Sequence, residues 1–222
     1  MRHRVAIRFA VTGDLRFLSH RDMLRLFERA VRRANLPIRY TQGFNPRPRL
    51  WLPLPRPVGV ESDDELLIVE LTGSQDPAGV YGRLAGQLPT SIGLREAFVL
   101  TSQTMPRPVE ATYSIGLCEP PGAELVAAVR RILTAEQIRI CRVSRKGNPP
   151  RWIDVRGGIV RIDVTRDAVT FTLRTGPTGS VRPAEVLEQL GLSPAEAPVR
   201  VRRVAVRWEG LQAEQPNERF PA

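Results

Sequence analysis

The chain has 222 residues, 42% of them hydrophobic, and a formal net charge of +10. This length suits one large or two small globular domains, and the hydrophobic content is sufficient for a core. No apolar run approaches the roughly 18 residues that a membrane span requires, and Arg8 interrupts the apolar part of the N-terminus, which argues against a signal peptide. We therefore expect a cytoplasmic protein with no membrane partner.

The two cysteines, Cys118 and Cys141, fit no metal-ligand spacing. We expect both to be buried as small hydrophobic residues rather than to act as redox partners. No metal site and no cofactor are expected.

The first half of the chain alternates strand and helix signals. Ser19 is an N-cap with Asp22 three residues later, and Asp76 followed by Pro77 marks a second helix start. In chain order the predicted elements are a strand over 4–10, a loop over 11–17, a helix over 19–35, an interrupted strand over 38–44 and 49–54, a strand over 65–73, a helix over 76–89 and a strand over 92–101. This β-α-β-β-α-β order is the ferredoxin-like unit, whose strand order 4-1-3-2 places the second strand at an edge.

The second half repeats this order with an extra strand, after a proline-containing linker over 102–110. Its predicted elements are a strand over 111–119, a helix over 122–135, a strand over 138–145, two or three strands within 152–175, a helix over 182–191 and a strand over 199–210. We therefore expect an α+β protein of two tandem ferredoxin-like domains with antiparallel sheets. They would span residues 1–105 and 106–211, with a polar tail over 212–222.

The positive charge is concentrated near the N-terminus. Residues 1–56 contain 13 arginines and three acidic residues, whereas residues 57–106 contain two arginines and seven acidic residues. Only Lys146 among the 33 basic residues is a lysine, so a biased genome offers an alternative explanation for the arginine excess. Such a bias would spread arginine more evenly, so the distribution favours a localised anion-binding surface and predicts RNA as a partner.

Two neighbouring segments supply the candidate RNA contacts. Arg21, Arg25, Arg29 and Arg32 lie within about 80° on the 19–35 helix, where they could bind phosphates or form a solvated face in which Glu28 pairs with Arg32. The next segment, YTQGFNPRP (residues 40–48), has prolines that an edge strand tolerates. Its aromatic and arginine residues alternate as in surfaces that bind single-stranded nucleic acid.

The alternative for this segment is that Tyr40 and Trp51 pack into the core. We expect the helix and the edge segment to form one site. A basic loop in the second half is either a further phosphate contact or simply an exposed loop. The remaining predicted RNA contacts are Arg33, Tyr40, Gln42, Phe44, Asn45, Arg47, Arg49, Arg145, Lys146 and Arg151.

Residues 16–71 resemble the radical-SAM-linked protein family, a bacterial family of unknown function. Its members read approximately SH-x-D, RA-x-RR, Y-x-QGFNPHP and PLPVGVES-x-E. The resemblance implies a radical S-adenosylmethionine (SAM) partner and gives no reaction. Arg47 stands where the family often has histidine, and two cysteines cannot hold an iron–sulfur cluster. The matching residues are Ser19, His20, Asp22, Arg29, Arg33, Gly43, Phe44, Asn45, Pro46, Pro48, Gly59, Glu61 and Ser62.

Three functions are open at this point. The first is a non-catalytic accessory module that binds tRNA or rRNA for a radical SAM enzyme. The second is a metal-independent RNA endonuclease, similar to those that process CRISPR RNA. His20 would be its general base, with a pKa lowered by the helix N-terminus, although His20 also fits a structural role. The third is a protein-binding scaffold whose edge strand extends a partner's sheet.

Overall fold

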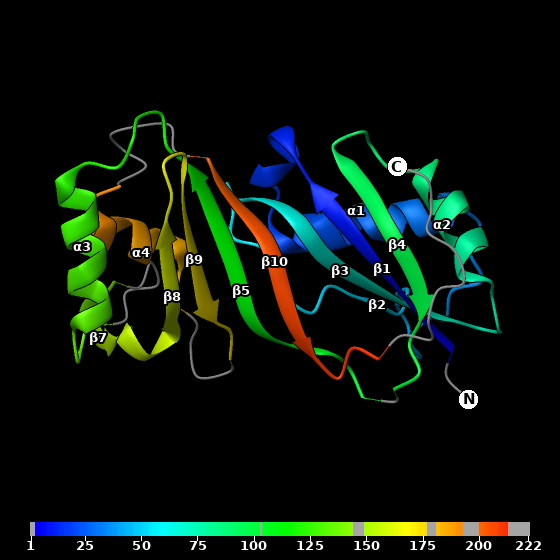
Figure 1. Ribbon diagram of the computed structural model, residues 1–222. Coiled ribbons are helices and arrows are strands. Elements are labelled where there is room, and N and C mark those ends of the chain that lie inside the picture. The colour runs from blue at the N-terminus through cyan, green and yellow to red at the C-terminus, as the bar shows by residue number, and fades with distance from the viewer. Residues whose placement is uncertain (1–2, 103, 144–148, 177–180, 193–199, 213–222) are drawn as a thin grey trace. The chain divides into compact units, whose positions relative to one another are not determined.

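The computed structural model describes residues 3–102, 104–143, 149–176, 181–192 and 200–212 (Figure 1). These residues form a mixed α+β fold with mostly antiparallel strand pairing and four α-helices, as the α+β prediction expects. The chain divides into two compact units, one comprising Met1–Pro108 with Trp208–Ala222 and the other comprising Val109–Arg207. We call them unit 1 and unit 2.

The described residues of unit 1 include the strands β1 to β4 and the helices α1 and α2. Strand β1 pairs antiparallel with both β3 and β4, and β2 pairs antiparallel with β3. These pairings place β1 between β4 and β3, and β2 pairs with β3 off the main path of the sheet. The elements are β1 (His3–Val11), the 3-10 helix η1 (Gly13–Phe17), α1 (His20–Arg33), β2 (Leu50–Trp51), β3 (Glu61–Leu71), α2 (Pro77–Ala85) and β4 (Ile92–Val99).

Both helices begin at the predicted caps. The Ser19 hydroxyl accepts a hydrogen bond from the backbone N–H of Asp22, which satisfies a donor that the first turn leaves unpaired. Asp76 caps α2 in the same way, with Pro77 at its first position. The apolar face of α1 packs on the sheet, where Phe27 meets Phe9 edge-to-face at 4.9 Å between ring centroids.

The predicted strand over 38–44 and 49–54 is wrong in extent. Strand β2 contains only Leu50–Trp51, and the preceding residues make isolated bridges from Ile38 to Leu71 and from Tyr40 to Pro48. Residues 41–47 leave the sheet, and Pro46 within them has no N–H to donate to a ladder. The 11–17 segment, predicted as a loop, contains η1.

The face of the unit 1 sheet opposite α1 is also covered. Phe98 and Leu100 belong to a second buried cluster against which Trp51 and Trp208 pack. Apolar side chains therefore cover both faces of this sheet. The exposed residues of the predicted site lie along its β2 edge.

Unit 2 has the strand order β10-β5-β9-β8, with β6 and β7 paired separately as a two-stranded sheet. The predicted extra strand is thus one member of an extra hairpin. The predicted linker over 102–110 is too long, because β5 begins at Arg107. The elements are β5 (Arg107–Gly116), α3 (Ala123–Thr134), β6 (Arg139–Arg142), β7 (Arg151–Asp154), η2 (Arg156–Gly158), β8 (Ile159–Val164), β9 (Ala168–Arg174), α4 (Pro183–Leu190) and β10 (Val201–Glu209).

The prediction that both cysteines are buried is wrong, because Cys118 and Cys141 are exposed. Cys118 lies in the turn that follows β5, and Cys141 alternates with the half-buried Ile140 on β6. Burial on a strand depends on which face the register presents to the core.

Candidate functional site

Three arginines surround one buried glutamate at the β2 edge of unit 1. The Glu70 carboxylate is fully buried, and a guanidinium nitrogen of Arg4, of Arg39 and of Arg49 lies 3.4 Å from it in each case. Since one carboxylate faces three guanidinium groups, the cluster keeps two formal positive charges. The side chains of Arg39 and Arg49 remain 47% and 31% exposed. We call these four residues the edge cluster.

Backbone hydrogen bonds fix the edge cluster to the sheet. The Arg39 N–H donates to the Glu70 carbonyl at 2.8 Å, and the Glu70 N–H donates to the Arg49 carbonyl at 3.0 Å. Arg4 also lies 5.8 Å from the centre of the Trp51 ring, a cation–π arrangement that limits its movement. The arginines of the edge cluster are therefore held in place before any ligand binds.

Residues 41–47, which we call the edge loop, project from this cluster. The Thr41 N–H donates to the Arg47 carbonyl at 2.9 Å, and the Arg47 N–H donates to the Thr41 hydroxyl at 3.0 Å. Gly43 has a φ of +124°, a conformation that favours glycine. Phe44 is fully exposed, and Tyr40, beside the loop, is 40% exposed.

The predicted contacts Gln42, Asn45 and Arg47 are likewise exposed. The alternative of core packing therefore holds for Trp51, which packs against the second cluster, but not for Tyr40.

Two of the helix arginines, Arg29 and Arg33, lie on a different surface from the edge cluster. Arg21, Arg25, Arg29, Arg32 and Arg33 are all exposed on α1. Arg29 and Arg33 line an open groove of about 480 Å³ with residues 86–89, which follow α2, and Arg33 donates to the Gln87 carbonyl there at 3.0 Å. His20 and Leu24 instead border Trp51 beside β2. The Arg29–Arg33 groove and the β2 edge thus lie on different sides of α1.

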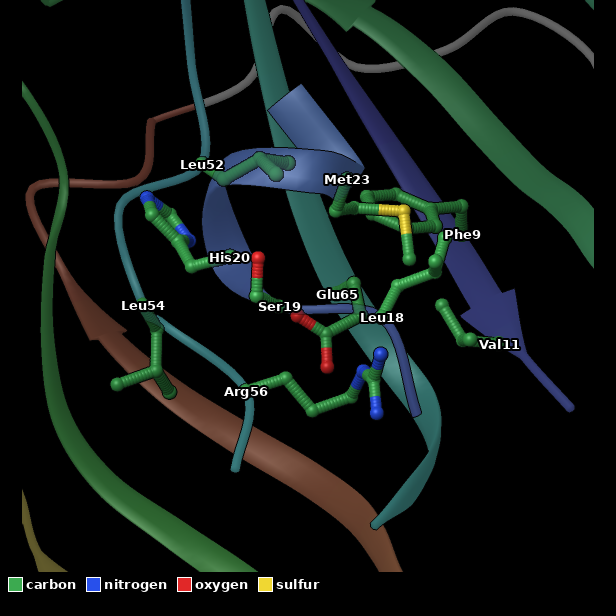
Figure 2. A pocket seen from close by; sticks show the side chains of 10 residues that line it. All are labelled: Phe9, Val11, Leu18, Ser19, His20, Met23, Leu52, Leu54, Arg56 and Glu65. Atoms are coloured by element: carbon green, nitrogen blue, oxygen red, sulfur yellow. The ribbon is translucent and has the colours of Figure 1, made fainter. Parts of the chain in front are cut away.

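His20 borders a small cavity at the start of α1 (Figure 2). The cavity measures about 10 Å³, about the space that one water molecule needs. Phe9 and Met23 supply apolar walls, and the buried Glu65 supplies a carboxylate from β3. His20 also borders an open, mainly apolar pocket of about 300 Å³ beside Trp51.

Burial lowers the pKa of His20 below its ordinary value of 6.5, although the Glu65 carboxylate acts in the opposite direction. The direction agrees with the sequence-based expectation, and the largest cause is desolvation of the imidazolium. At pH 7 the imidazole is therefore mainly neutral.

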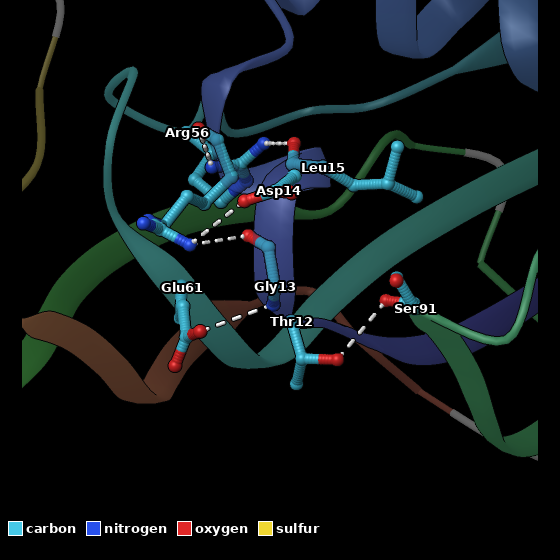
Figure 3. Close-up of polar contacts among 8 residues, drawn as sticks. Thr12, Gly13, Asp14, Leu15, Arg56, Glu61 and Ser91 are labelled. Atoms are coloured by element: carbon cyan, nitrogen blue, oxygen red, sulfur yellow. Dashed lines mark hydrogen bonds and ion pairs between the residues drawn. The ribbon is translucent and has the colours of Figure 1, made fainter.

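A buried arginine holds the segment that leads into α1 (Figure 3). The Arg56 guanidinium donates to the carbonyls of Leu15 at 3.0 Å and Arg16 at 2.7 Å, and also to the carbonyl of Val60. The Gly13 N–H donates to the Glu61 carboxylate at 3.0 Å. These bonds tie η1 to the turn before β3 and so fix the approach to Ser19 and His20.

In unit 2, Arg151 is exposed at the start of β7, directly opposite Arg142. Arg145 and Lys146 lie outside the described residues. Of the predicted contacts in the basic loop of the second half, the structure therefore places only Arg151, at the start of β7.

Comparison with known proteins places the chain in a family. Residues 4–183 match the model of a family described as an uncharacterised protein conserved in bacteria, DUF2344. The chain belongs to this family. No curated protein matches it. A solved structure of an unknown protein from Galdieria sulphuraria is similar at 12% identity, over 94% of this chain and 99% of that chain, with a TM-score of 0.28.

The DUF2344 match covers the edge cluster and the His20 cavity and carries no link to radical SAM enzymes. Within the described part of this DUF2344 chain, no helix has the length and apolar character to cross a bilayer. The same residues contain no group of three or more His, Cys, Asp or Glu side chains that could hold a metal ion.

Sequence reasoning missed several residues of this DUF2344 site, namely Arg4, Arg56, Glu65 and Glu70. Glu70 had a readable signal, because a glutamate inside the apolar run ELLIVEL is costly to bury without a charged partner. The sequence did not show which arginines would meet it.

Proposed function

We propose that this DUF2344 protein is a non-catalytic accessory module that binds single-stranded regions of RNA in the bacterial cytoplasm and acts with a radical SAM enzyme. The edge cluster carries the RNA assignment, because its excess positive charge lies beside the exposed aromatic rings of Tyr40 and Phe44. The radical SAM partner rests only on the resemblance of residues 16–71.

We further propose that each unit is a ferredoxin-like domain. The orders β4-β1-β3-β2 and β10-β5-β9-β8 support this assignment, with the β6–β7 hairpin inserted between α3 and β8 of the second unit. The extra hairpin would then be a feature of unit 2 rather than a departure from its core topology.

Binding would divide between phosphate and base contacts. Arg39 and Arg49 have exposed guanidinium groups that can donate to phosphate oxygens, while Phe44 offers a planar face on which an unpaired base stacks. Because the Thr41–Arg47 hydrogen bonds already close the edge loop, little ordering entropy would be lost on binding.

Fluorescence anisotropy of a labelled single-stranded RNA, measured with the full chain, tests this function. Affinity should fall steeply between about 50 and 200 mM salt. Phe44→Ala should weaken binding about 5- to 100-fold through lost stacking, and Arg47→Ala should reduce the salt slope by about 0.7. Arg95→Ala is the matched control, because Arg95 is exposed on β4 at the opposite edge of the unit 1 sheet.

Absent RNA binding, or binding that does not respond to salt, would overturn the proposal. Co-purification of a radical SAM protein that survives nuclease treatment, without RNA affinity, would instead support the protein-scaffold function. The assignment to RNA and the assignment to a protein partner are therefore separable.

A nuclease is the second candidate, favoured by the neutral His20 beside the buried Glu65. The cavity between them has room for about one water molecule, so a nucleotide would have to reach His20 through the apolar pocket beside Trp51. Cleavage of RNA that persists unchanged in a His20→Ala variant would remove this candidate.

A further inference from the structure

The β6–β7 hairpin of unit 2 presents a tryptophan to solvent. Trp152 is 65% exposed and lies directly opposite Cys141, which is also exposed. The next pair, Ile140 and Ile153, points to the other face and is half-buried. The strand alternation thus places the indole on the outer face of the hairpin.

Two anchors hold this hairpin in place. Arg142 donates to both carboxylate oxygens of Glu185 in α4, at 2.6 and 2.8 Å. At the other end, the Asp154 carboxylate accepts the backbone N–H groups of Ile138 at 2.9 Å and Arg156 at 3.0 Å. A two-stranded hairpin alone is marginally stable, so these bonds account for a fixed presentation of Trp152.

On the two strands of the hairpin, the exposed charged side chains are Arg139, Arg151 and Asp154, which together carry a net positive charge. Arg139 and Asp154 lie directly opposite each other and share the outer face with Trp152, whereas Arg151, which pairs with Arg142, starts from the other face. The Arg142 charge is already neutralised by Glu185. The Asp154 carboxylate accepts hydrogen bonds from the Ile138 and Arg156 amides, which hold its pKa below the ordinary value, so it stays ionised beside Arg139.

We propose that the β6–β7 hairpin is a second contact for single-stranded RNA, in which a base stacks on Trp152 and a phosphate meets Arg139 on the same face. An exposed aromatic ring beside a basic side chain is an arrangement that binds unpaired bases with little sequence preference. This inference rests on the proposed function, because it assumes the same ligand, but it uses side chains of the other unit.

The fluorescence of Trp152 provides a local test. The chain has three tryptophans, so a Trp51→Phe/Trp208→Phe variant leaves Trp152 as the only one. The difference between wild type and Trp152→Phe gives the same signal without altering the unit 1 core. Oligouridine should quench this emission in a saturable, salt-sensitive way. Trp152→Ala should weaken RNA binding about 5- to 100-fold, whereas Val126→Ala, at an exposed position of α3, should not.

The outcomes separate the two sites. RNA binding that depends on Phe44, with no quenching and no effect of Trp152→Ala, would overturn the hairpin contact and leave the edge site standing. Quenching that persists in Phe44→Ala, with affinity independent of Phe44 and Arg47, would support the hairpin and overturn the edge site. Complete absence of RNA binding would overturn both, and capture of an acidic protein through Trp152 without quenching by RNA would overturn the hairpin contact.

Discussion

Replacement of Arg56 by methionine should destabilise unit 1 through the loss of one buried hydrogen-bond donor group. Methionine keeps an unbranched, flexible side chain but cannot donate to the carbonyls of Leu15, Arg16 and Val60. Arg56 is 8% exposed, so water replaces these bonds only in part. At about 1.5–3 kcal/mol for each hydrogen bond to a charged group, and with a discount for partial hydration, we expect a loss of about 3 kcal/mol.

Urea unfolding, combined with hydrogen exchange at single amides, measures both the global and the local effect. The Gly59 N–H donates to the Arg16 carbonyl at 2.8 Å, and the Leu18 N–H donates to the Leu15 carbonyl at 3.1 Å. Both amides should lose protection in Arg56→Met, because their acceptors belong to the segment that Arg56 holds. Arg56→Lys should give an intermediate loss, since lysine keeps the charge but not the planar fork of donors.

Arg95→Met is the control for the loss of an arginine, because Arg95 is exposed on β4; its effect should stay within about 0.5 kcal/mol. The reasoning would be refuted if Arg56→Met changed stability by less than about 1 kcal/mol while the Gly59 amide kept its protection. Another interaction would then hold η1 against the turn before β3.

Three further predictions concern caps and titration. Ser19→Ala should cost about 1 kcal/mol in urea unfolding, and a loss near zero would show that the cap is dispensable. NMR titration should place the His20 pKa below 6.5; Glu65→Gln should lower it further, so a rise would contradict the assigned role of the carboxylate. For Glu185, burial raises the pKa, but hydrogen bonds led by the one from Arg142 outweigh it and hold the pKa below 4.5. Its stabilisation should therefore be present above about pH 4.5 and be lost as pH falls through the folded-state pKa. Glu185→Gln should remove this component from melting curves recorded at several pH values, and an unchanged pH profile would contradict it.

The sequence by itself determined the elements whose signals are local. Ser19 and the Asp76–Pro77 pair set helix starts through bonds made within a few residues. The edge position of β2 also followed from sequence, because Pro46 and Pro48 exclude an interior strand. The extent of that strand could not be predicted from the sequence, since closure of the edge loop depends on the contact of Thr41 with Arg47.

Only the tertiary structure decided which charges meet. Glu70 gathers Arg4 from β1, 66 residues away, and Arg39 and Arg49 from the β2 edge, because the β1–β3 register sets Arg4 opposite Glu70. The exposure of Cys141 and Trp152 likewise follows from the register of the β6–β7 hairpin. A one-residue change of register moves every side chain of a strand to the other face, and local sequence patterns do not specify which strands pair.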